Sequence, residues 1–384
     1  MKKILVIALA LGLAFFAANV NAQEKYVGGG FEMSGSIVTG MGYQYHNDKA
    51  NTEIATGVDG VLTGPGPMGK YMGADSSKKH YFGFFLDGVE LDIMKSFGEN
   101  VRLRADLDFG RVNSFAAGTQ AFVLEQAYAT ANIPAGNGVE FLVGRFNAPI
   151  GFESVDVADN DLISQTILIR SQIRPVGLTG AKIYYAFSDL VDLHFWAANR
   201  IINDDNFGRT ANMPALGARI GFNWGEEGTE STFGISPFFG PSDGSSNRHY
   251  SFGVDADINW WLTESFALGL EGIYRRDNAL VPGVDENLNT FAGLLNLHYV
   301  FSDVWDGTLR YSMAMQRQGT NGPIDYIGTG IKQQVHEIAL GGGYAVADGA
   351  KFKLEGRFDI VKPTSGAGET QYVFGAVMGF VYNF

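Results

Sequence analysis

The stretch Val101-Arg102-Leu103-Arg104-Ala105-Asp106-Leu107-Asp108-Phe109 alternates strictly between apolar and charged residues. Successive side chains of a β-strand point to opposite faces, so this segment has one apolar face and one face of arginines and aspartates. A strand of about 9 to 11 residues is long enough to cross a bilayer when it is tilted. The stretch therefore predicts a strand with lipid on one side and water on the other.

The same alternation recurs along the chain and is also clear in 191–200, 250–262 and 351–360. We count about sixteen such segments, and an even number is typical of bacterial outer-membrane barrels. The expected strands are 31–46, 80–95, 101–113, 121–133, 139–146, 178–187, 190–200, 215–224, 230–240, 249–262, 266–275, 289–301, 306–317, 333–346, 350–361 and 371–384.

These strands predict an all-β fold, a closed antiparallel transmembrane β-barrel, because a bilayer does not tolerate open sheet edges. Short links such as Ser188-Asp189, 263–265 and 347–349 would be periplasmic turns, and longer connections would be extracellular loops. A soluble β-sandwich or propeller also alternates, but one soluble core seldom needs sixteen strands. A barrel of this size has a lumen too wide for wall side chains to fill.

The start of the chain predicts a signal peptide over residues 1–22. Lys2 and Lys3 precede an apolar run, and Val20-Asn21-Ala22 offers small residues for cleavage. An uncleaved anchor helix is the alternative, although no stop-transfer pattern follows. The expected barrel then spans 23–384, which is 384 − 22 = 362 residues with a formal charge of 26 − 41 = −15.

This composition excludes several classes of function. The acidity argues against nucleic acid as a partner. The chain has no cysteine, which excludes disulfides, thiolate metal sites and c-type haem attachment. Glycine supplies 51 of the 384 residues, and its place inside strand patterns suits a curved sheet whose backbones approach closely.

The last expected strand, 371–384, places aromatic residues on one face and ends on Phe384. In this respect the chain resembles bacterial outer-membrane porins, whose terminal strand ends in Phe and is read by the barrel-assembly machinery. The resemblance implies an assembly signal in Phe380, Tyr382 and Phe384. It also implies an outer-membrane location, with lipid and lipopolysaccharide around the barrel.

A narrower resemblance rests on Glu125-Gln126-Ala127-Tyr128, on 143–153 and on Asp159-Asn160. These motifs look like the putative β-barrel porin-2 family across about 121–200, and elsewhere the likeness is architectural. A similar pattern occurs in phosphate-selective porins of the O and P type, so both families stay open. Phosphate selectivity needs a ladder of Lys and Arg, whereas the third long loop, 147–177, carries four acids against Arg170 and Arg174.

The resemblance implies that this third loop folds into the lumen and narrows it. The four acids, Glu153, Asp156, Asp159 and Asp161, would then face wall bases and create a transverse field. The expected wall bases are Arg102, Arg104, Arg219 and Arg357. Alternatively, these charges only pair across strands and keep the wall hydrated. Expected lumen acids slightly outnumber bases, which predicts a weak cation preference.

Other chemistry has little support. Asp156, Asp159 and Asp161 offer oxygen ligands for Ca²⁺, but they lack the glycine and glutamate positions of an EF-hand, so no metal site is assigned. The six histidines show no ligand spacing. No G-x-S-x-G elbow or phosphate loop is present. We therefore expect no cofactor and no enzymatic activity.

The expected function is that of a porin, the passive diffusion of ions and small hydrophilic solutes through a water-filled barrel. Porins of this size are commonly trimers, so the resemblance implies a homotrimer. One alternative is a sheath or scaffold barrel around a partner such as an electron-transfer cytochrome. Another is an outer-membrane enzyme or adhesin. The first loop, 47–79, is long and rich in Gly and Pro around Gly64-Pro65-Gly66-Pro67, but its role stays open.

Overall fold

The computed structural model describes most of the chain outside the longest connections. The described residues are 30–47, 79–109, 122–170, 172–201, 213–241, 250–278, 287–317, 333–363 and 370–384. The expected signal peptide, 1–22, and residues 48–78 of the first loop lie outside them.

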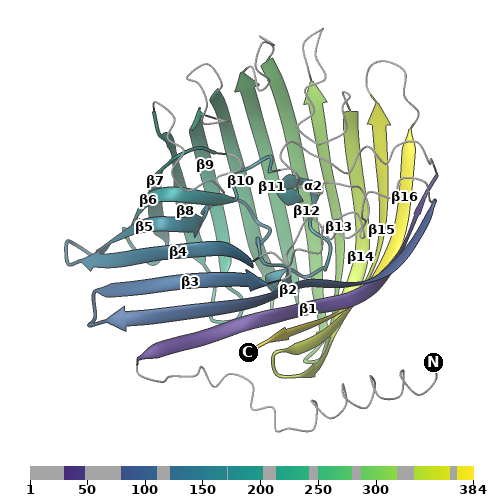
Figure 1. Ribbon diagram of the computed structural model, residues 1–384, viewed down its shortest axis with the longest axis horizontal. Helices are drawn as coiled ribbons and strands as arrows, with labels where there is room; N and C mark the ends of the chain where they lie inside the picture. The colour runs from purple at the N-terminus through teal and green to yellow at the C-terminus, as the bar shows by residue number, and fades with distance from the viewer. Residues whose placement is uncertain are drawn as a thin grey trace.

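Sixteen antiparallel strands in the described part of the chain close into one barrel (Figure 1). Each strand pairs with its neighbours in sequence, and β1 pairs with β16. The strands are β1 (Phe31–His46), β2 (His80–Phe97), β3 (Val101–Phe109), β4 (Phe122–Ile133), β5 (Val139–Asn147), β6 (Gly177–Ala186), β7 (Val191–Ala198), β8 (Ala215–Trp224), β9 (Ser231–Pro241), β10 (Tyr250–Thr263), β11 (Phe266–Asn278), β12 (Asn287–Ser302), β13 (Trp305–Arg317), β14 (Gln333–Ala347), β15 (Ala350–Pro363) and β16 (Gln371–Asn383).

The predicted fold class and the expected number of strands are therefore confirmed. Strand ends differ from the expected ones by a few residues. The expected extension of the third strand to residue 113 falls partly outside the described residues, because β3 ends at Phe109 and the description resumes at 122.

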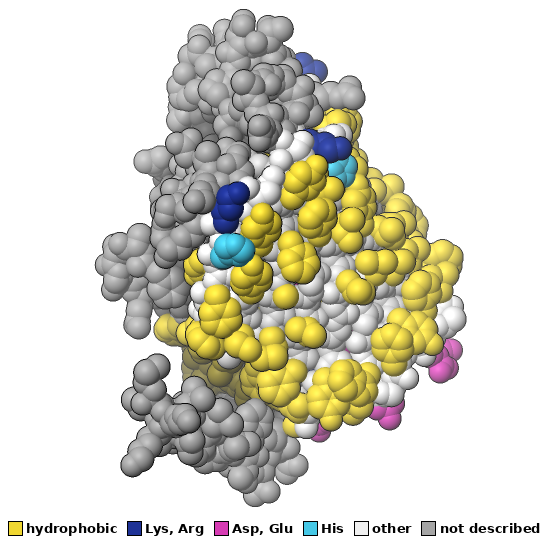
Figure 2. Space-filling model, turned by 90° about the vertical axis from the view of Figure 1, so that its right-hand side faces the viewer, with side chains coloured by type: hydrophobic (Ala, Val, Ile, Leu, Met, Phe, Trp, Pro, Cys, Tyr) yellow, Lys and Arg dark blue, Asp and Glu magenta, His cyan; other side chains and the backbone are white. Residues whose placement is uncertain are grey.

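As predicted, alternate side chains along a strand point to the outside of the barrel and into the lumen. On β3, Leu103 and Phe109 are exposed on the outside, whereas Asp106 and Asp108 are buried toward the lumen. The outer face turned toward the viewer in Figure 2 is mostly hydrophobic, and its charged side chains lie near its margins. This distribution matches an apolar band between two polar rims. No helix within the described residues has the length and apolarity to cross a membrane.

The barrel closes at the seam between β1 and β16. The amide of Gly35 donates to the carbonyl of Phe384 at 3.0 Å, and the amide of Phe384 donates to the carbonyl of Gly35 at 3.0 Å. The outer side of β16 exposes Phe374 and Met378, whereas its lumen side is also apolar and buries Val377. A polar lumen face was expected throughout, so something inside the barrel must cover this strand.

Two β-bulges interrupt the alternation and place acids toward the lumen. On β2 the register shifts opposite the Val38–Thr39 step, which leaves Asp87 as an extra residue. On β4 the register shifts opposite Asp106 and Leu107, which leaves Glu125 as an extra residue. Both side chains are buried. At each bulge the alternation of apolar and polar residues shifts by one position. The sequence alone therefore does not reveal where the two bulges lie.

Candidate functional site: the third loop inside the barrel

The third loop, residues 148–176 between β5 and β6, lies inside the barrel. It contains two short helices, η4 (Val157–Asp159) and α2 (Ile167–Arg170). η4 contacts β1 and β16, and α2 contacts β13. In Figure 1, α2 is surrounded by the strands of the wall. The loop therefore extends from β5 and β6 to distant strands of the closed sheet.

Backbone amides of the loop donate to three wall carboxylates on β11, β14 and β15. The amide of Phe152 donates to Glu271 at 2.8 Å, and the amide of Ile167 donates to Glu337 at 2.8 Å. The third carboxylate, Glu355, accepts from two successive loop amides at 3.0 and 2.9 Å. Loop amides have no hydrogen-bond partner of the kind that β-strands supply to one another. The bonds to the wall carboxylates satisfy them, and an irregular segment can therefore lie inside the barrel.

Three wall glycines make room for apolar side chains of the loop. A Cβ built on each glycine would lie 2.4 to 2.7 Å from a loop side chain, closer than real contacts allow. The pairs are Gly269 with Phe152, Gly341 with Leu162, and Gly379 with Ile163. The strand glycines that the sequence assigned to sheet curvature thus have a second use here, which is to let the loop approach the wall.

Apolar packing covers wall positions that would otherwise face water. The loop residues Ile150, Ile167, Leu168 and Ile173 are buried in one cluster with lumen-facing side chains of the wall, among them Trp196. A second cluster joins Val157 and Ile163 of the loop to Val38, Val377 and Val381 on the seam strands. The loop therefore covers the apolar lumen face of β16.

Buried ion pairs hold α2 to the wall. Glu337 on β14 pairs with both Arg170 of α2 and Arg357 of β15. Arg357 also pairs with Asp359 at 2.7 Å. All four side chains are buried. Removing one member of such a group would leave a charge in a poorly hydrated place, at a cost of about 3 to 5 kcal/mol.

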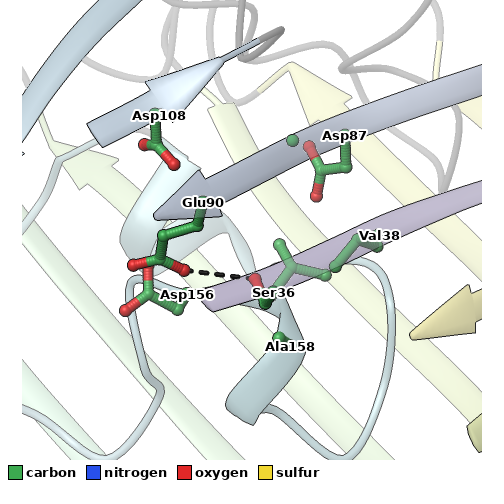
Figure 3. Close-up of a pocket in the computed structure, with 9 residues that line it drawn as sticks. Ser36, Val38, Asp87, Glu90, Asp108, Asp156 and Ala158 are labelled. Carbon is green, nitrogen blue, oxygen red and sulfur yellow. Dashed lines mark hydrogen bonds between the residues drawn. The ribbon is translucent and has the colours of Figure 1, made fainter. Parts of the chain in front are cut away.

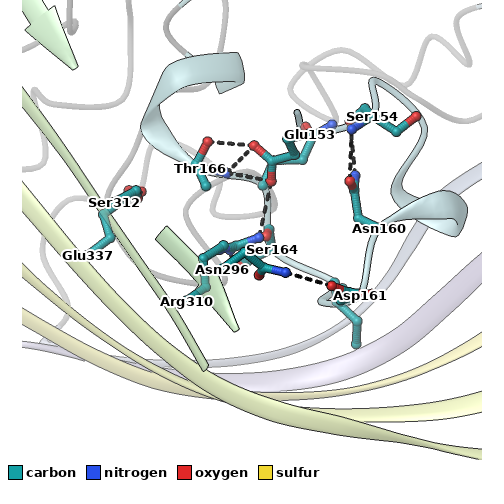
Figure 4. A network of polar contacts seen from close by, with 12 residues as sticks. Glu153, Ser154, Asn160, Asp161, Ser164, Thr166, Asn296, Arg310, Ser312 and Glu337 are labelled. Atoms are coloured by element: carbon teal, nitrogen blue, oxygen red, sulfur yellow. Dashed lines mark hydrogen bonds and ion pairs between the residues drawn. The ribbon is translucent and has the colours of Figure 1, made fainter. Parts of the chain in front are cut away.

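A second group of charges holds the two arms of the loop. Glu153 accepts from Arg310 of β13 at 3.1 Å and from the amide of Thr166 at 3.0 Å (Figure 4). Arg174, near the end of the loop, pairs with Glu271 at 3.2 Å. These contacts connect the start, middle and end of the loop to the wall, and we call them together with the Glu337 group the anchor.

The tip of the loop meets an acidic part of the wall. Asp156, Glu90 of β2 and Glu125 of β4 bring carboxylate oxygens within 4.8 Å of one another. Glu90 also accepts from the hydroxyl of Ser36 at 3.2 Å. Figure 3 shows Glu90 and Asp156 bordering a small pocket, about 20 Å³ in volume, into whose lining Asp87 and Asp108 also enter. This arrangement brings several acidic side chains together at the loop tip.

A family model described as "Putative beta-barrel porin-2, OmpL-like" matches residues 30–384. The chain belongs to this porin family. The match decides between the two families that the sequence motifs left open. It also makes the protein an outer-membrane porin and favours a channel over an enzyme.

Solved porin structures share the fold of this porin at low sequence identity. The outer membrane channel DcaP of Acinetobacter baumannii aligns with a TM-score of 0.59 and 14% identity, over 92% of this chain and 97% of that chain. An anion-selective porin from Comamonas acidovorans gives 0.60 and 14%, over 92% and 99%. The trimer form of OmpT from Vibrio cholerae gives 0.53 and 11%, over 92% and 99%. No curated protein sequence matches the chain.

Within this porin, the four predicted loop acids lie in different surroundings. Glu153 is buried in the anchor and does not face water. Asp161 accepts from the side-chain amide of Asn296 at 2.7 Å. Asp159 is the exposed member, and Asp156 is half-buried at the acidic wall. Asp156, Asp159 and Asp161 do not form a group of three close carboxylates, so the geometry of the calcium ligand set considered from sequence is not present.

The four predicted wall bases also separate. Arg357 is fully buried in the anchor, so it does not face the passage. Arg219 pairs with Asp257 at 2.8 Å, and Arg104 pairs with Asp106 at 2.7 Å.

Arg102 is exposed at the start of β3. The eight residues therefore do not gather at one place, because Glu153 and Arg357 lie in the anchor while Arg104 and Arg219 pair with other acids of the wall.

Sequence reasoning placed Asp108 on the water-facing side of its strand, but it did not assign Asp108, Glu90 or Glu125 to the constriction. Glu90 could have been found by extending the same parity argument to β2. Glu125 lies at a bulge, and no sequence signal placed it there.

Proposed function

We propose that the porin conducts ions and small hydrophilic solutes by passive diffusion, with a weak preference for cations set by the third loop and the acidic wall. The observation that carries this proposal is the pairing of charges. Arginines of the anchor are neutralised by buried acids, whereas the exposed Asp159 and the nearby Asp156, Glu90 and Glu125 place carboxylates together at the loop tip. Grouped carboxylates attract cations and repel anions.

The test is the reversal potential of the refolded protein in a planar bilayer under a KCl gradient. We expect a potential of the sign that marks potassium preference. In the variant Asp156→Asn/Asp159→Asn, the potential should move toward zero. The control is Glu264→Gln, in the turn between β10 and β11, which removes a charge far from the loop tip and should change little. A clear chloride preference in the unmodified protein would contradict the proposal.

The sheath alternative fits the structure less well. A sheath around a partner protein needs an unobstructed lumen, whereas here the third loop occupies the interior and is attached by buried ion pairs. We also propose a homotrimer in the outer membrane. Light scattering of the detergent-solubilised protein should give the mass of three chains, and a single-chain mass would remove the trimer.

A further inference from the structure

The outer wall of the barrel differs in charge between its two ends. On the face in Figure 2, which includes β15 and β16, Lys, Arg and His side chains lie near the upper and left margins, and Asp and Glu side chains lie near the lower right margin. The exposed acids of the short turns include Glu264, Asp303 and Asp348. At the long-loop end, Lys362 of β15 is exposed. The described acids of β14, β15 and β16 are all buried, and they are Glu337, Glu355 and Asp359.

A tyrosine–histidine pair adjoins Lys362 on the outer face. Lys362 lies opposite Gln334 of β14, and His336 lies opposite Ile360, so Lys362 and His336 occupy diagonal positions, which are about 7 to 8 Å apart in a sheet. The hydroxyl of Tyr311 lies 2.7 Å from Nδ1 of His336. A hydroxyl that donates to Nδ1 leaves the ring proton on Nε2. His336 then offers an N–H donor next to the ammonium of Lys362.

The same pair recurs on the other side of the seam, at the same end of the barrel. The hydroxyl of Tyr43 on β1 lies 2.7 Å from Nδ1 of His80 on β2, and both side chains are exposed. In the order of the sheet, β15 and β16 lie between the two pairs. Lys362 is therefore flanked by two imidazole donors with no described carboxylate beside them on this part of the outer face. Grouped cationic and N–H donors without an acid suit the oxygens of a phosphate group.

Exposed apolar side chains continue the outer face from these donors toward the short-turn end. Phe358, Tyr372 and Phe374 of β15 and β16 are exposed, and the rings of Phe358 and Tyr372 stack with their centres 6.1 Å apart. Free phosphate would contact only the donors, and an uncharged lipid only the apolar surface. A phosphate group attached to acyl chains contacts both.

The long loops of outer-membrane barrels lie on the extracellular side, so a lipid that reaches this part of the wall belongs to the outer leaflet. We propose that the long-loop end of β13–β16, β1 and β2 binds a phosphorylated lipid of the outer leaflet, with a phosphate at Lys362 and His336 and the acyl chains along β15 and β16. The partner is selected by charge complementarity at one end of the outer wall and by apolar contact below it.

The test measures lipid binding to the detergent-solubilised protein by native mass spectrometry. One probe is lipid A with both of its phosphates, and the other is the same lipid A after both phosphates have been removed. We expect the phosphorylated form to bind more tightly. Loss of a charge-assisted hydrogen bond should raise its dissociation constant about tenfold in Lys362→Gln, and His336→Phe should also weaken binding. Lys362→Arg, which keeps the charge and the donors, should retain most of the affinity.

The control is Arg276→Gln, which removes an exposed base at the long-loop end of β11, away from the two pairs. It should leave lipid binding unchanged. The site is overturned if both forms of lipid A bind equally, or if Arg276→Gln weakens binding as much as Lys362→Gln does. Displacement of the lipid by an equal concentration of inorganic phosphate would make the free anion the ligand and would also overturn the proposal. The heat-resistant gel band checks that each variant folds.

Discussion

Gly269 on β11 illustrates how a single residue can position the third loop. Its missing side chain leaves the space that the ring of Phe152 occupies, and a Cβ there would lie 2.4 Å from the ring. The adjacent amide of Phe152 is held by Glu271 on the same strand. Two residues of β11 therefore hold Phe152: Gly269 makes room for its ring, and Glu271 accepts a hydrogen bond from its backbone amide.

We expect Gly269→Val to displace Phe152 and loosen the start of the loop. Overpacking of this kind costs about 1 to 3 kcal/mol, so the barrel should lose its heat-resistant gel band at a lower temperature and the single-channel current should become noisier. The matched control is Gly272→Val on the same strand, where an added Cβ meets nothing within 4 Å. Equal behaviour of the two variants would show that Gly269 is not needed by the loop.

We expect Asp159 to make the cation preference of the pore depend on pH. Its side chain reaches lumen water, yet enclosure by the barrel raises its pKa above the ordinary value of 3.8, and Lys353 and Arg104 only partly oppose this. The carboxyl is charged above its pKa and neutral below it. Cation preference should therefore begin to fall, as the pH is lowered, at a higher pH than for an ordinary aspartate.

The measurement is the reversal potential as a function of pH for the unmodified protein and for Asp159→Asn. The two should differ at neutral pH and converge in acid, where the native carboxyl is protonated. A constant difference across the whole range would mean that Asp159 does not titrate in the passage. Asp348→Asn, in the exposed turn between β14 and β15, serves as the control.

At the scale of elements, the anchor around Glu337 joins α2 to two strands. Glu337→Gln keeps the shape but removes the charge that Arg170 and Arg357 share. We expect a loss of about 3 to 5 kcal/mol, because two buried guanidinium groups lose a common partner. Thermal unfolding followed by circular dichroism measures it.

The control is Asp306→Asn, which breaks the pair with the partly exposed Lys351. That pair should contribute only about 0 to 1 kcal/mol. A Glu337→Gln variant as stable as Asp306→Asn would mean that the anchor contributes little to holding the loop.

The strands were predictable because each repeats one simple rule, an apolar residue toward lipid and a polar one toward water. The rule carried through β3, through 250–260 of β10 and through 351–360 of β15. It could not predict Asp87 and Glu125, since an extra residue shifts the period within the strand.

The third loop was harder to predict for a different reason. Its structure depends on wall positions far away in sequence, such as Gly341 and Gly379, and not on a local pattern. The apolar pairs Leu162-Ile163 and Ile167-Leu168 are unusual for a loop that faces water, and they are the local signal that it is covered. These contacts with distant wall positions also decide that Glu153 and Arg357 belong to the anchor and do not line the pore.

For the whole molecule, the position of the loop predicts how much water the barrel can hold. Deleting 153–165 removes η4 and the tip of the loop, and we expect a higher single-channel conductance because the lumen widens. A gel-shift assay for the heat-resistant barrel first checks that the variant folds. Unchanged conductance in a folded variant would mean that the loop does not narrow the pore. Replacing the same residues by an equal number of Gly and Ser distinguishes the loss of bulk from the loss of the anchor.

The contact of η4 with both β1 and β16 has a mechanical consequence. These two strands come from opposite ends of the barrel sequence, and their separation would open the cylinder along its length. Val157 and Ile163 bridge them from the inside through Val38, Val377 and Val381. Separation of β1 from β16 therefore requires the loss of this apolar contact as well as of the backbone hydrogen bonds between the two strands. The same loop that lies inside the barrel thus also resists splitting of the cylinder.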